Sequence, residues 1–382
     1  MRDAPSGTSD RTAGDRTPAA EHGPGDALAA DHTTGDTPAA DHTAGDTPAA
    51  DHATGDGPHP LRFLRLLLSL LIATSDRGLR RLGITSIVVN VLIVVTGGAV
   101  RLTGSGLGCP DWPTCNAGSV LPVADPEVAA FHQAIEFGNR LLTFLVLAVV
   151  AAALISARRR RPRRPDLVRS ASWLVAGVLG QGVVGGITVL TRLNPLVVAL
   201  HFLLSMALIV LAVVFHHRTR GPAGPTRVAV PRHLRHAEHL LLAAVAVVLV
   251  LGTLVTASGP HAGDPGTPRL GIDPELISQF HADAVFLVLG LTIALWFALR
   301  ATAAPVAAQR GATALLAVVL AQGTIGYVQY FTGLPELLVG AHLLGACLVW
   351  IAAVRLLLAT TTRSAAVPGE PAPTPRSEYA AT

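Results

Sequence analysis

Long apolar runs alternate with short polar segments over most of the chain, from about residue 84 to residue 358. A helix needs about 20 residues to cross a hydrocarbon core of roughly 30 Å, and eight of the runs approach that length. The expected spans are 84–101, 133–157, 171–191, 196–215, 239–257, 276–299, 311–331 and 337–358. The pattern predicts an all-α integral membrane protein with eight transmembrane helices.

One stretch of the sequence occurs twice. Gln181–His201 reads QGVVGGITVLTRLNPLVVALH, and Gln322–His342, 141 residues further on, reads QGTIGYVQYFTGLPELLVGAH. In both copies a Gln-Gly pair opens an apolar run, a short polar break follows, and a lone His closes the stretch. A repeat of this length in apolar segments indicates internal duplication. We therefore expect the eight helices to form two pseudo-symmetric four-helix bundles.

The composition and the placement of arginine agree with a membrane protein. Half of the 382 residues are hydrophobic and only 14% are charged, whereas about 25% of the residues in soluble domains are charged. The net charge of +4 does not indicate nucleic acid, because the arginines cluster beside apolar runs, where they act as topology signals. They precede the first span and crowd the even-numbered loops, which predicts a multi-pass protein of the cell membrane with both termini in the cytoplasm.

The remaining segments complete the predicted domain organisation. Low-complexity repeats such as DHTTGDTPAA fill the beginning of the chain and bury too little apolar surface to fold. The apolar run at 61–74 is too short to span the membrane and fits an interfacial helix. The expected parts are a disordered tail (1–60), an interfacial or cytoplasmic segment (61–83), an N-terminal half (84–215), a cytoplasmic linker (216–238), a C-terminal half (239–358) and a second disordered tail (359–382).

Four histidines lie in or at the ends of the expected spans: His132, His201, His281 and His342. An ionisable side chain inside a membrane is costly and is by default a candidate functional residue. Imidazole is a common axial ligand of heme iron, while the alternative is that each histidine hydrogen-bonds a neighbouring helix. Four histidines at matching depth favour a metal or heme site, and zinc fits less well because the histidines come singly on separate helices.

The second span differs from its counterpart in the other half. When both helices are counted back from their cytoplasmic arginine, Asn139 occupies the position equivalent to His281. His132 lies two turns further out, on nearly the same helix face. Glu136 and Arg140 share this helix, and buried charges of this kind indicate a pair or chemistry rather than added stability. The first half is therefore interpreted as the working half and the second as a fixed cofactor site.

Two consecutive motifs resemble a known family. Gly97–Cys115 (GGAVRLTGSGLGCPDWPTC) and His132–Arg140 (HQAIEFGNR) are similar to the heme A synthase family of bacteria and mitochondria, and the resemblance extends over about residues 84–358. It implies a membrane oxidoreductase that serves the assembly of cytochrome c oxidase. Such an enzyme converts the C8 methyl group of heme O to the formyl group of heme A by successive hydroxylations.

The resemblance also implies a set of site residues. They are His281 and His342 for heme b, His201 for the substrate heme, Glu136 and Arg140 for catalysis, and Cys109 and Cys115 for a disulfide. The family usually has a histidine where this chain has Asn139, so His132 is the candidate second ligand of the substrate heme. Glu136 is expected either to stabilise positive charge at the methyl carbon or to accept a proton.

Two other functions also fit a duplicated membrane protein with buried histidines. A diheme b-type electron carrier needs only the four histidines, but it leaves Glu136 and the cysteine pair unexplained. A transporter is less favoured, because no span is visibly broken at its middle. The expected partners of the enzyme are membrane lipid, heme O with the heme O synthase that supplies it, and an electron donor or acceptor. Association into a homo-oligomer is left open.

Overall fold

The protein is described by a computed structural model, which covers residues 75–116, 118–123 and 129–364. All of these residues belong to one compact unit, Pro58–Thr382. The tail predicted for 1–60, the interfacial helix predicted for 61–74 and the chain after residue 364 lie outside the described residues.

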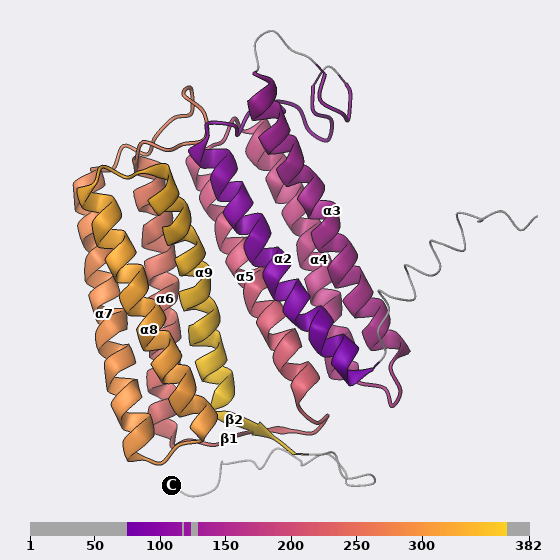
Figure 1. Ribbon diagram of the computed structural model, residues 1–382, viewed down its shortest axis with the longest axis vertical. Helices are drawn as coiled ribbons and strands as arrows, with labels where there is room; N and C mark the ends of the chain where they lie inside the picture. Colours follow the sequence, from indigo (N-terminus) through magenta and orange to yellow (C-terminus); the bar gives the residue numbers. More distant parts are fainter. Residues whose placement is uncertain (1–74, 117, 124–128, 365–382) are drawn as a thin grey trace, which may run out of the picture. The chain divides into compact units, whose positions relative to one another are not determined.

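Within the described part of the chain, eight helices are long and apolar enough to cross a membrane. They are α2 (Asp76–Leu102), α3 (Ala130–Arg159), α4 (Pro165–Leu190), α5 (Pro195–Arg220), α6 (Arg232–Ser258), α7 (Pro274–Ala301), α8 (Val306–Phe331) and α9 (Glu336–Ala359), shown in Figure 1. Two short strands, β1 (Thr226–Val228) and β2 (Thr361–Arg363), complete the secondary structure of these residues. The expected all-α membrane fold with eight spanning helices is confirmed.

Capping residues set where several helices begin. Ser75 accepts a hydrogen bond from the backbone N–H of Gly78 at the start of α2 (3.1 Å). Asn194 caps α5 in the same way, and Asp273 caps α7 by accepting from two backbone N–H groups. Both α5 and α7 then have proline as their first residue, where its missing N–H costs nothing.

The helices extend beyond the apolar spans, because polar turns outside the hydrocarbon also take helical geometry. The difference is largest around the segment 216–238, which the sequence suggests is a linker. Its histidines lie in the last turns of α5 and the first turns of α6 (His216, His217, His233 and His236). Only residues 221–231, with β1, connect these two helices.

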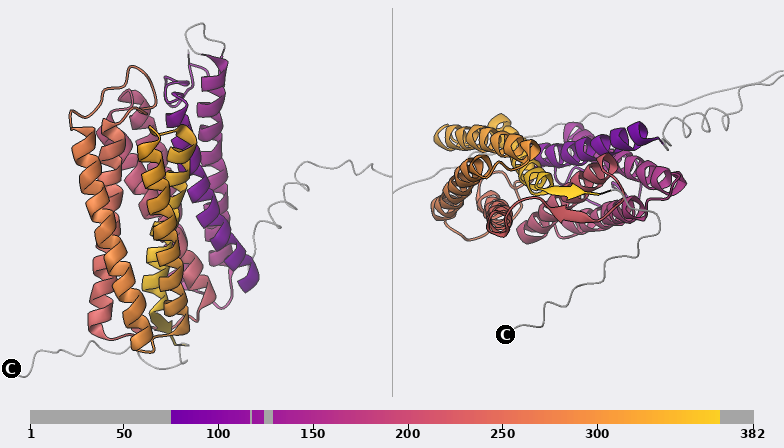
Figure 2. Two further views of the ribbon diagram at one scale, coloured as in Figure 1. Left: turned by 60° about the vertical axis from the view of Figure 1, so that its left-hand side comes forward. Right: turned by 90° about the horizontal axis from the view of Figure 1, so that it is seen from below.

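The helices form two groups of four. In the first group α2 contacts α3 and α5, and α4 contacts the same two helices, while α6 to α9 close a similar ring in the second group (Figures 1 and 2). The groups meet where α9 contacts α2 and α5 and where α5 contacts α6. Trp350 of α9 donates its indole N–H to the carbonyl of Met206 in α5 across this junction (3.0 Å, buried). The pseudo-symmetry of the two whole bundles stays a prediction.

The duplicated stretch has the same turn in both copies. In the first copy Arg192 and Leu193 have φ values of 52° and 58°, and in the second Gly333 and Leu334 have 78° and 60°. The N–H of Leu193 donates to Thr188 (2.9 Å), and that of Leu334 donates to the residue at the same place in its own copy (2.8 Å). These left-handed residues end α4 and α8 and reverse the chain before the helices that carry His201 and His342.

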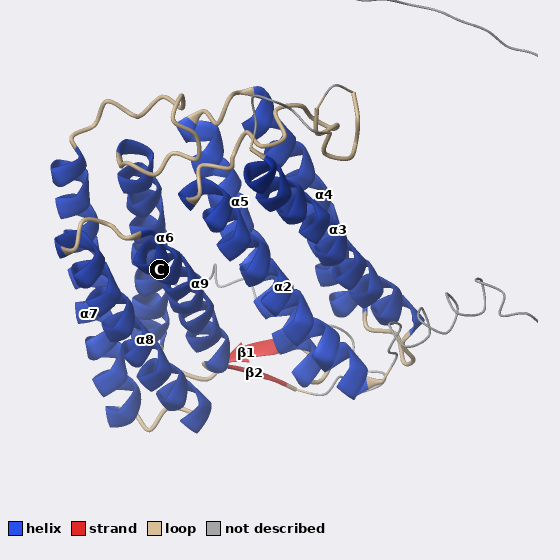
Figure 3. Cartoon of the chain, turned by 45° about the horizontal axis from the view of Figure 1, so that its top comes forward, coloured by secondary structure: helices blue, strands red, loops and turns tan. Residues whose placement is uncertain are grey.

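The two strands and a carboxylate connect the halves at the other end of the helices. β1 and β2 pair in antiparallel orientation, at the end opposite the long loops (Figure 3). Arg363 of β2 donates to Asp166 at the start of α4 (3.0 Å), and Arg164 donates to both oxygens of the same carboxylate (3.0 Å each). The segment that follows the last helix is thereby attached to the first half.

Candidate functional site

His281 and His342 face each other inside the second group of helices. His281 belongs to α7 and His342 to α9, and their ring centroids are 6.4 Å apart with the ring planes at 60°. Both Nδ1 atoms are buried, and neither has a hydrogen-bond partner among the described residues. Two imidazoles that ligate one metal ion from opposite sides, with bonds of about 2 Å, have a similar centroid separation. The pair fits a heme iron held between the two rings.

Each of these rings packs against a glycine of a neighbouring helix. A Cβ atom at Gly252 of α6 would lie 3.2 Å from Cε1 of His281, and one at Gly326 of α8 would lie 3.1 Å from Cε1 of His342. The side-chain amide of Gln322 donates to the backbone carbonyl of His342 (2.8 Å). The glycines leave room for the rings, and Gln322 holds α8 and α9 together at the level of the histidine.

In the first group of helices, His201 has the same surroundings as His342. Its Nδ1 is also buried without a partner among the described residues. A Cβ at Gly185 of α4 would lie 3.2 Å from Cε1 of His201, and Gln181 donates to the backbone carbonyl of His201 (2.9 Å). A glycine and a glutamine at the same places in the repeat contact His342 in the second copy.

Asn139 stands opposite a glycine in the same way. A Cβ at Gly97 of α2 would lie 3.9 Å from Nδ2 of Asn139, just as a Cβ at Gly252 would meet His281. The hydroxyl of Thr96 donates to Oδ1 of Asn139 (2.8 Å). The contact supports Asn139 as the structural counterpart of His281, in a place where an amide is already hydrogen-bonded.

His132 lies in the first turn of α3 and is tied to the loop that follows α2. Its Nδ1 is 2.8 Å from the hydroxyl of Ser105, and that hydroxyl is 2.7 Å from the hydroxyl of Thr103. A histidine that ligates a metal usually has its other ring nitrogen hydrogen-bonded in this manner. His132 is therefore oriented by Ser105, with Nε2 left for another partner.

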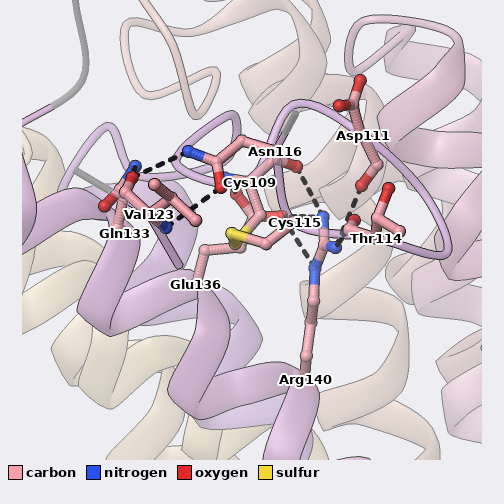
Figure 4. Close-up of a disulfide and its surroundings, with 9 residues drawn as sticks. All are labelled: Cys109, Asp111, Thr114, Cys115, Asn116, Val123, Gln133, Glu136 and Arg140. Carbon is pink, nitrogen blue, oxygen red and sulfur yellow. Dashed lines mark hydrogen bonds and ion pairs between the residues drawn. A yellow bond between two sulfur atoms is a disulfide. The ribbon is translucent and has the colours of Figure 1, made fainter. Parts of the chain in front are cut away.

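A disulfide joins Cys109 to Cys115 in the loop between α2 and α3 (Figure 4). Both sulfur-bearing side chains are buried. Inside the loop the N–H of Cys115 donates to the carbonyl of Ser119 (2.7 Å), and the N–H of Asp111 donates to the carbonyl of Cys115 (3.2 Å). The cysteine pair therefore closes a small, internally hydrogen-bonded loop near the N-terminal end of α3.

Glu136 and Arg140 attach this loop to α3. One oxygen of Glu136 pairs with Arg140 (2.7 Å) and the other accepts the N–H of Cys109 (2.7 Å). Arg140 also donates to three loop carbonyls, those of Cys109 (2.5 Å), Asp111 (3.0 Å) and Thr114 (2.8 Å), as Figure 4 shows. A planar guanidinium suits such a set of acceptors because its donors are fixed in a fork. The two charged residues predicted for chemistry thus hold the disulfide loop in place.

Two contacts of the site were missed by the sequence interpretation. The first is the bond from Ser105 to His132, which no spacing rule indicates because a loop carries Ser105. The second is the packing of Trp112, in the disulfide loop, against Gly186 of α4. The sequence does contain a signal for this packing, because the first copy of the repeat has Gly185-Gly186 where the second has Gly326-Tyr327.

The fold and these residues define a multi-pass α-helical membrane protein with buried imidazoles between its helices and a disulfide loop at one end. A family model described as cytochrome oxidase assembly protein matches residues 80–263. The match contains the disulfide loop, α3 and His201, and ends before His281. The chain is similar to this family over these residues, which are a little under half of its length.

Curated relatives are similar to part of the chain as well. Over 178 residues the chain is 33% identical to a heme A synthase of Geobacillus kaustophilus (strain HTA426), an alignment that covers 43% of this chain and 54% of the relative. It is 33% identical over 142 residues to a heme A synthase of Geobacillus thermodenitrificans, covering 34% of this chain and 42% of the relative. The chain thus spans about half the length of the curated relatives it matches.

Proposed function

We propose that this protein oxidises the C8 methyl group of heme O to a formyl group, which produces heme A for cytochrome c oxidase. The observation that carries the proposal is His201, whose buried ring nitrogen has no partner among the described residues and which lies inside the segment matched by the family. Replacing two C–H bonds of a methyl group by a C=O bond takes one oxygen atom from water and releases four protons and four electrons. The reaction therefore needs an electron acceptor, which we propose is reached through the second half.

His281 and His342 are the proposed ligands of a heme b. When bound there, heme b supplies a one-electron carrier. The chain contributes the two facing imidazoles, 6.4 Å apart between centroids, and the glycines that let the rings pack closely. Gln322 keeps α8 and α9 in register at this depth. This half does no proton chemistry in the proposal.

The substrate heme is proposed to bind in the first half, with His201 on its iron. His132 is the proposed second ligand, because Ser105 already orients its ring and Asn139 stands where the second half has a histidine. Glu136 lies on the same helix as His132, one turn away. The substrate site is thus built from α3, α4 and α5 and from the loop that the disulfide closes.

Glu136 is proposed to stabilise positive charge that develops on the methyl carbon. This role fits better than accepting a proton, because both carboxylate oxygens already accept hydrogen bonds, from Arg140 and from the N–H of Cys109. Protonation would displace one of these donors. Arg140 is a positioning residue in this scheme, since it holds Glu136 and the loop carbonyls together.

The topology supports an outer, oxidising location for the disulfide loop. The arginines of the loop between α3 and α4 lie at the same end as the start of α2, where Arg160 pairs with Asp76. Such clusters favour the cytoplasmic side. We propose that both termini are cytoplasmic, that heme O arrives from heme O synthase, and that the electron partner docks on the protein from within or beside the membrane lipid.

Pigment analysis of the purified full-length protein tests the function. The host should make heme O but no heme A. We expect extracted heme A together with heme b. Heme b without heme A would instead favour the diheme electron carrier, and no heme at all would contradict both functions.

Variants at two glutamates sharpen this test. Glu136→Gln should lower the conversion of heme O at least about 100-fold, the size of effect seen when one preorganised electrostatic group is lost. Glu275→Gln, at an exposed position in the first turn of α7, is the matched control and should convert heme O normally. Full conversion by Glu136→Gln would refute the role given to this carboxylate.

A further inference from the structure

Trp112 packs directly against the backbone of α4. A Cβ atom at Gly186 would overlap the indole ring and would lie 2.8 Å from its Nε1. Gly186 is buried, yet 40% of the Trp112 surface remains exposed. The indole therefore rests on the helix through glycine and keeps a large apolar area for a second contact.

The loop that carries Trp112 is held on several sides. The disulfide between Cys109 and Cys115 brackets Trp112 in the sequence. Arg140 donates to the carbonyl of Asp111, the residue before Trp112, and to that of Thr114, two residues after Trp112. Fixing the backbone on both sides of Trp112 lowers the entropy that the indole would lose on binding a ligand.

The place where Trp112 contacts α4 is next to the place where the proposed iron ligand, His201, contacts the same helix. Gly185 packs against the ring of His201, and Gly186, the next residue, packs against Trp112. Consecutive residues of a helix point about 100° apart. The two rings therefore approach α4 at the same depth from neighbouring directions.

Among the described residues, the second half has no such arrangement. At the position of Gly186 the second copy has Tyr327, which is 52% exposed. The glycine that faces the histidine is kept in both copies, as Gly185 and Gly326. The glycine that accepts Trp112 occurs only in the half proposed to bind the substrate, so its purpose is specific to that half.

We infer that Trp112 forms a wall of the substrate site and binds the planar macrocycle of the substrate porphyrin by aromatic stacking. The inference rests on the proposed function, because it takes the first half as the site of heme O. Indole offers a large, rigid apolar face, and such aromatic contacts contribute beyond simple burial. Trp112 thereby determines how long the first half retains heme O, while the heme b of the second half is not affected.

Release of heme from the full-length, heme-loaded protein tests this inference. The protein is mixed with excess apomyoglobin, and the transfer of heme O and of heme b is followed separately. Trp112→Leu should release heme O about threefold to tenfold faster, the range expected for one lost aromatic contact. Trp112→Phe, which keeps a flat ring, should restore most of the retention. The release of heme b should be the same in all three proteins.

Two glycine variants of α4 keep the test independent of the loss of tryptophan. Gly186→Ala leaves Trp112 in the chain but pushes the indole away, so it should also speed the release of heme O. Gly180→Ala is the matched control, because a Cβ there would meet no other atom within 4 Å. Thiol labelling of each variant checks that the disulfide has formed.

The outcomes separate this inference from the proposed function. If the wild-type protein retains heme O and Trp112→Leu releases it at the same rate, Trp112 is only a loop anchor and the inference is wrong while the function stands. If Trp112→Leu releases both hemes faster, the residue acts on the whole fold and the inference is also wrong. A wild-type protein that binds no heme O would overturn the function and the inference together.

Discussion

Four side chains in the membrane share one packing motif, a glycine of a neighbouring helix that faces a ring or an amide. His201, His281 and His342 each lie against such a glycine, and Asn139 lies against Gly97. Glycine is needed at these places because a methyl group would come within about 3.2 Å of the histidine rings, closer than most Cβ contacts. The motif marks four equivalent positions, and the first half has an amide at one of them.

In a His132→Ala background, which removes the proposed second ligand, Asn139→His should therefore give the substrate heme its second imidazole. Gly97 leaves room for the larger ring, since a Cβ there would be 3.9 Å from the asparagine amide. We expect heme O to be retained at least about tenfold longer, the effect that even an outer partner of a ligand has on metal affinity. The absorption spectrum of the purified variant should also change to that of an iron with two imidazole ligands.

A triple variant provides the control for this prediction. When His201→Ala is added to His132→Ala/Asn139→His, the new imidazole has no partner across the iron, so both the longer retention and the new spectrum should disappear. If Asn139→His leaves the spectrum of bound heme O unchanged in the His132→Ala background, the position does not face the iron. The equivalence of Asn139 and His281 would then be limited to their packing.

At the scale of single elements, the spanning helices could be predicted from the sequence but their ends and loop contacts could not. Apolar runs of sufficient length must be helical in a bilayer, because only a helix satisfies its own backbone there. The ends depend on polar caps such as Asp273, which lie outside the apolar pattern. The bond from Ser105 to His132 and the packing of Trp112 depend on how one loop folds over α3 and α4, which no periodicity encodes.

The candidate histidines could be picked out from the sequence for a related reason. A lone histidine in an apolar run is conspicuous, and His201 and His342 occupy the same position in the two copies of the repeat. The separation of 6.4 Å between the rings of His281 and His342 was not predictable, because it depends on how α7 and α9 pack. Sequence likewise could not indicate that Glu136 and Arg140 bind the loop backbone.

The repeated turn before α5 and α9 allows us to predict how one substitution changes the stability of the protein. Gly333 has a φ of 78°, a conformation that costs an L-residue about 1–2 kcal/mol. Gly333→Ala should therefore destabilise the protein by about 1 kcal/mol, although Arg192 at the same place in the first copy shows that a side chain is tolerated. The apparent midpoint of thermal unfolding in one detergent, at one scan rate, measures the effect.

Gly323 supplies the comparison within the same repeat. It lies inside α8, and a Cβ there would meet no other atom within 4 Å. Gly323→Ala should raise the midpoint, because alanine is favoured over glycine in a helix by about 0.5–1 kcal/mol. Opposite shifts for the two variants are required, and a higher midpoint for Gly333→Ala would contradict the account of the turn.

At the scale of the whole molecule, polar bonds join the two groups of helices at the end that carries the disulfide loop. Arg101, at the end of α2, donates to the carbonyl of Thr256 in α6 (2.6 Å) and to that of His261. The N–H of Gly106 donates to the carbonyl of Gly263 (2.9 Å). Electrons that pass between the halves in the proposed reaction require this junction to stay closed.

Cleavage of the linker tests whether the junction holds without the covalent connection. A protease site placed in residues 221–225, between α5 and β1, allows the folded full-length protein to be cut after purification. A tag on the C-terminal half should then still recover the N-terminal half. Arg101→Met should reduce this recovery about tenfold, because hydrogen bonds from a charged donor contribute about 1.5–3 kcal/mol and about 1.4 kcal/mol is a factor of ten.

Arg269→Met is the matched control for this measurement. Arg269 also donates to a backbone carbonyl at this end of the helices, that of Pro260, but the bond stays within the second half. Its loss should leave the recovery at the wild-type level. Equal recovery for Arg101→Met and Arg269→Met would mean that apolar packing between α5 and α9 suffices. Complete separation of the cut wild-type protein would mean that the linker itself holds the halves, and electron transfer across the junction would then depend on residues 221–231.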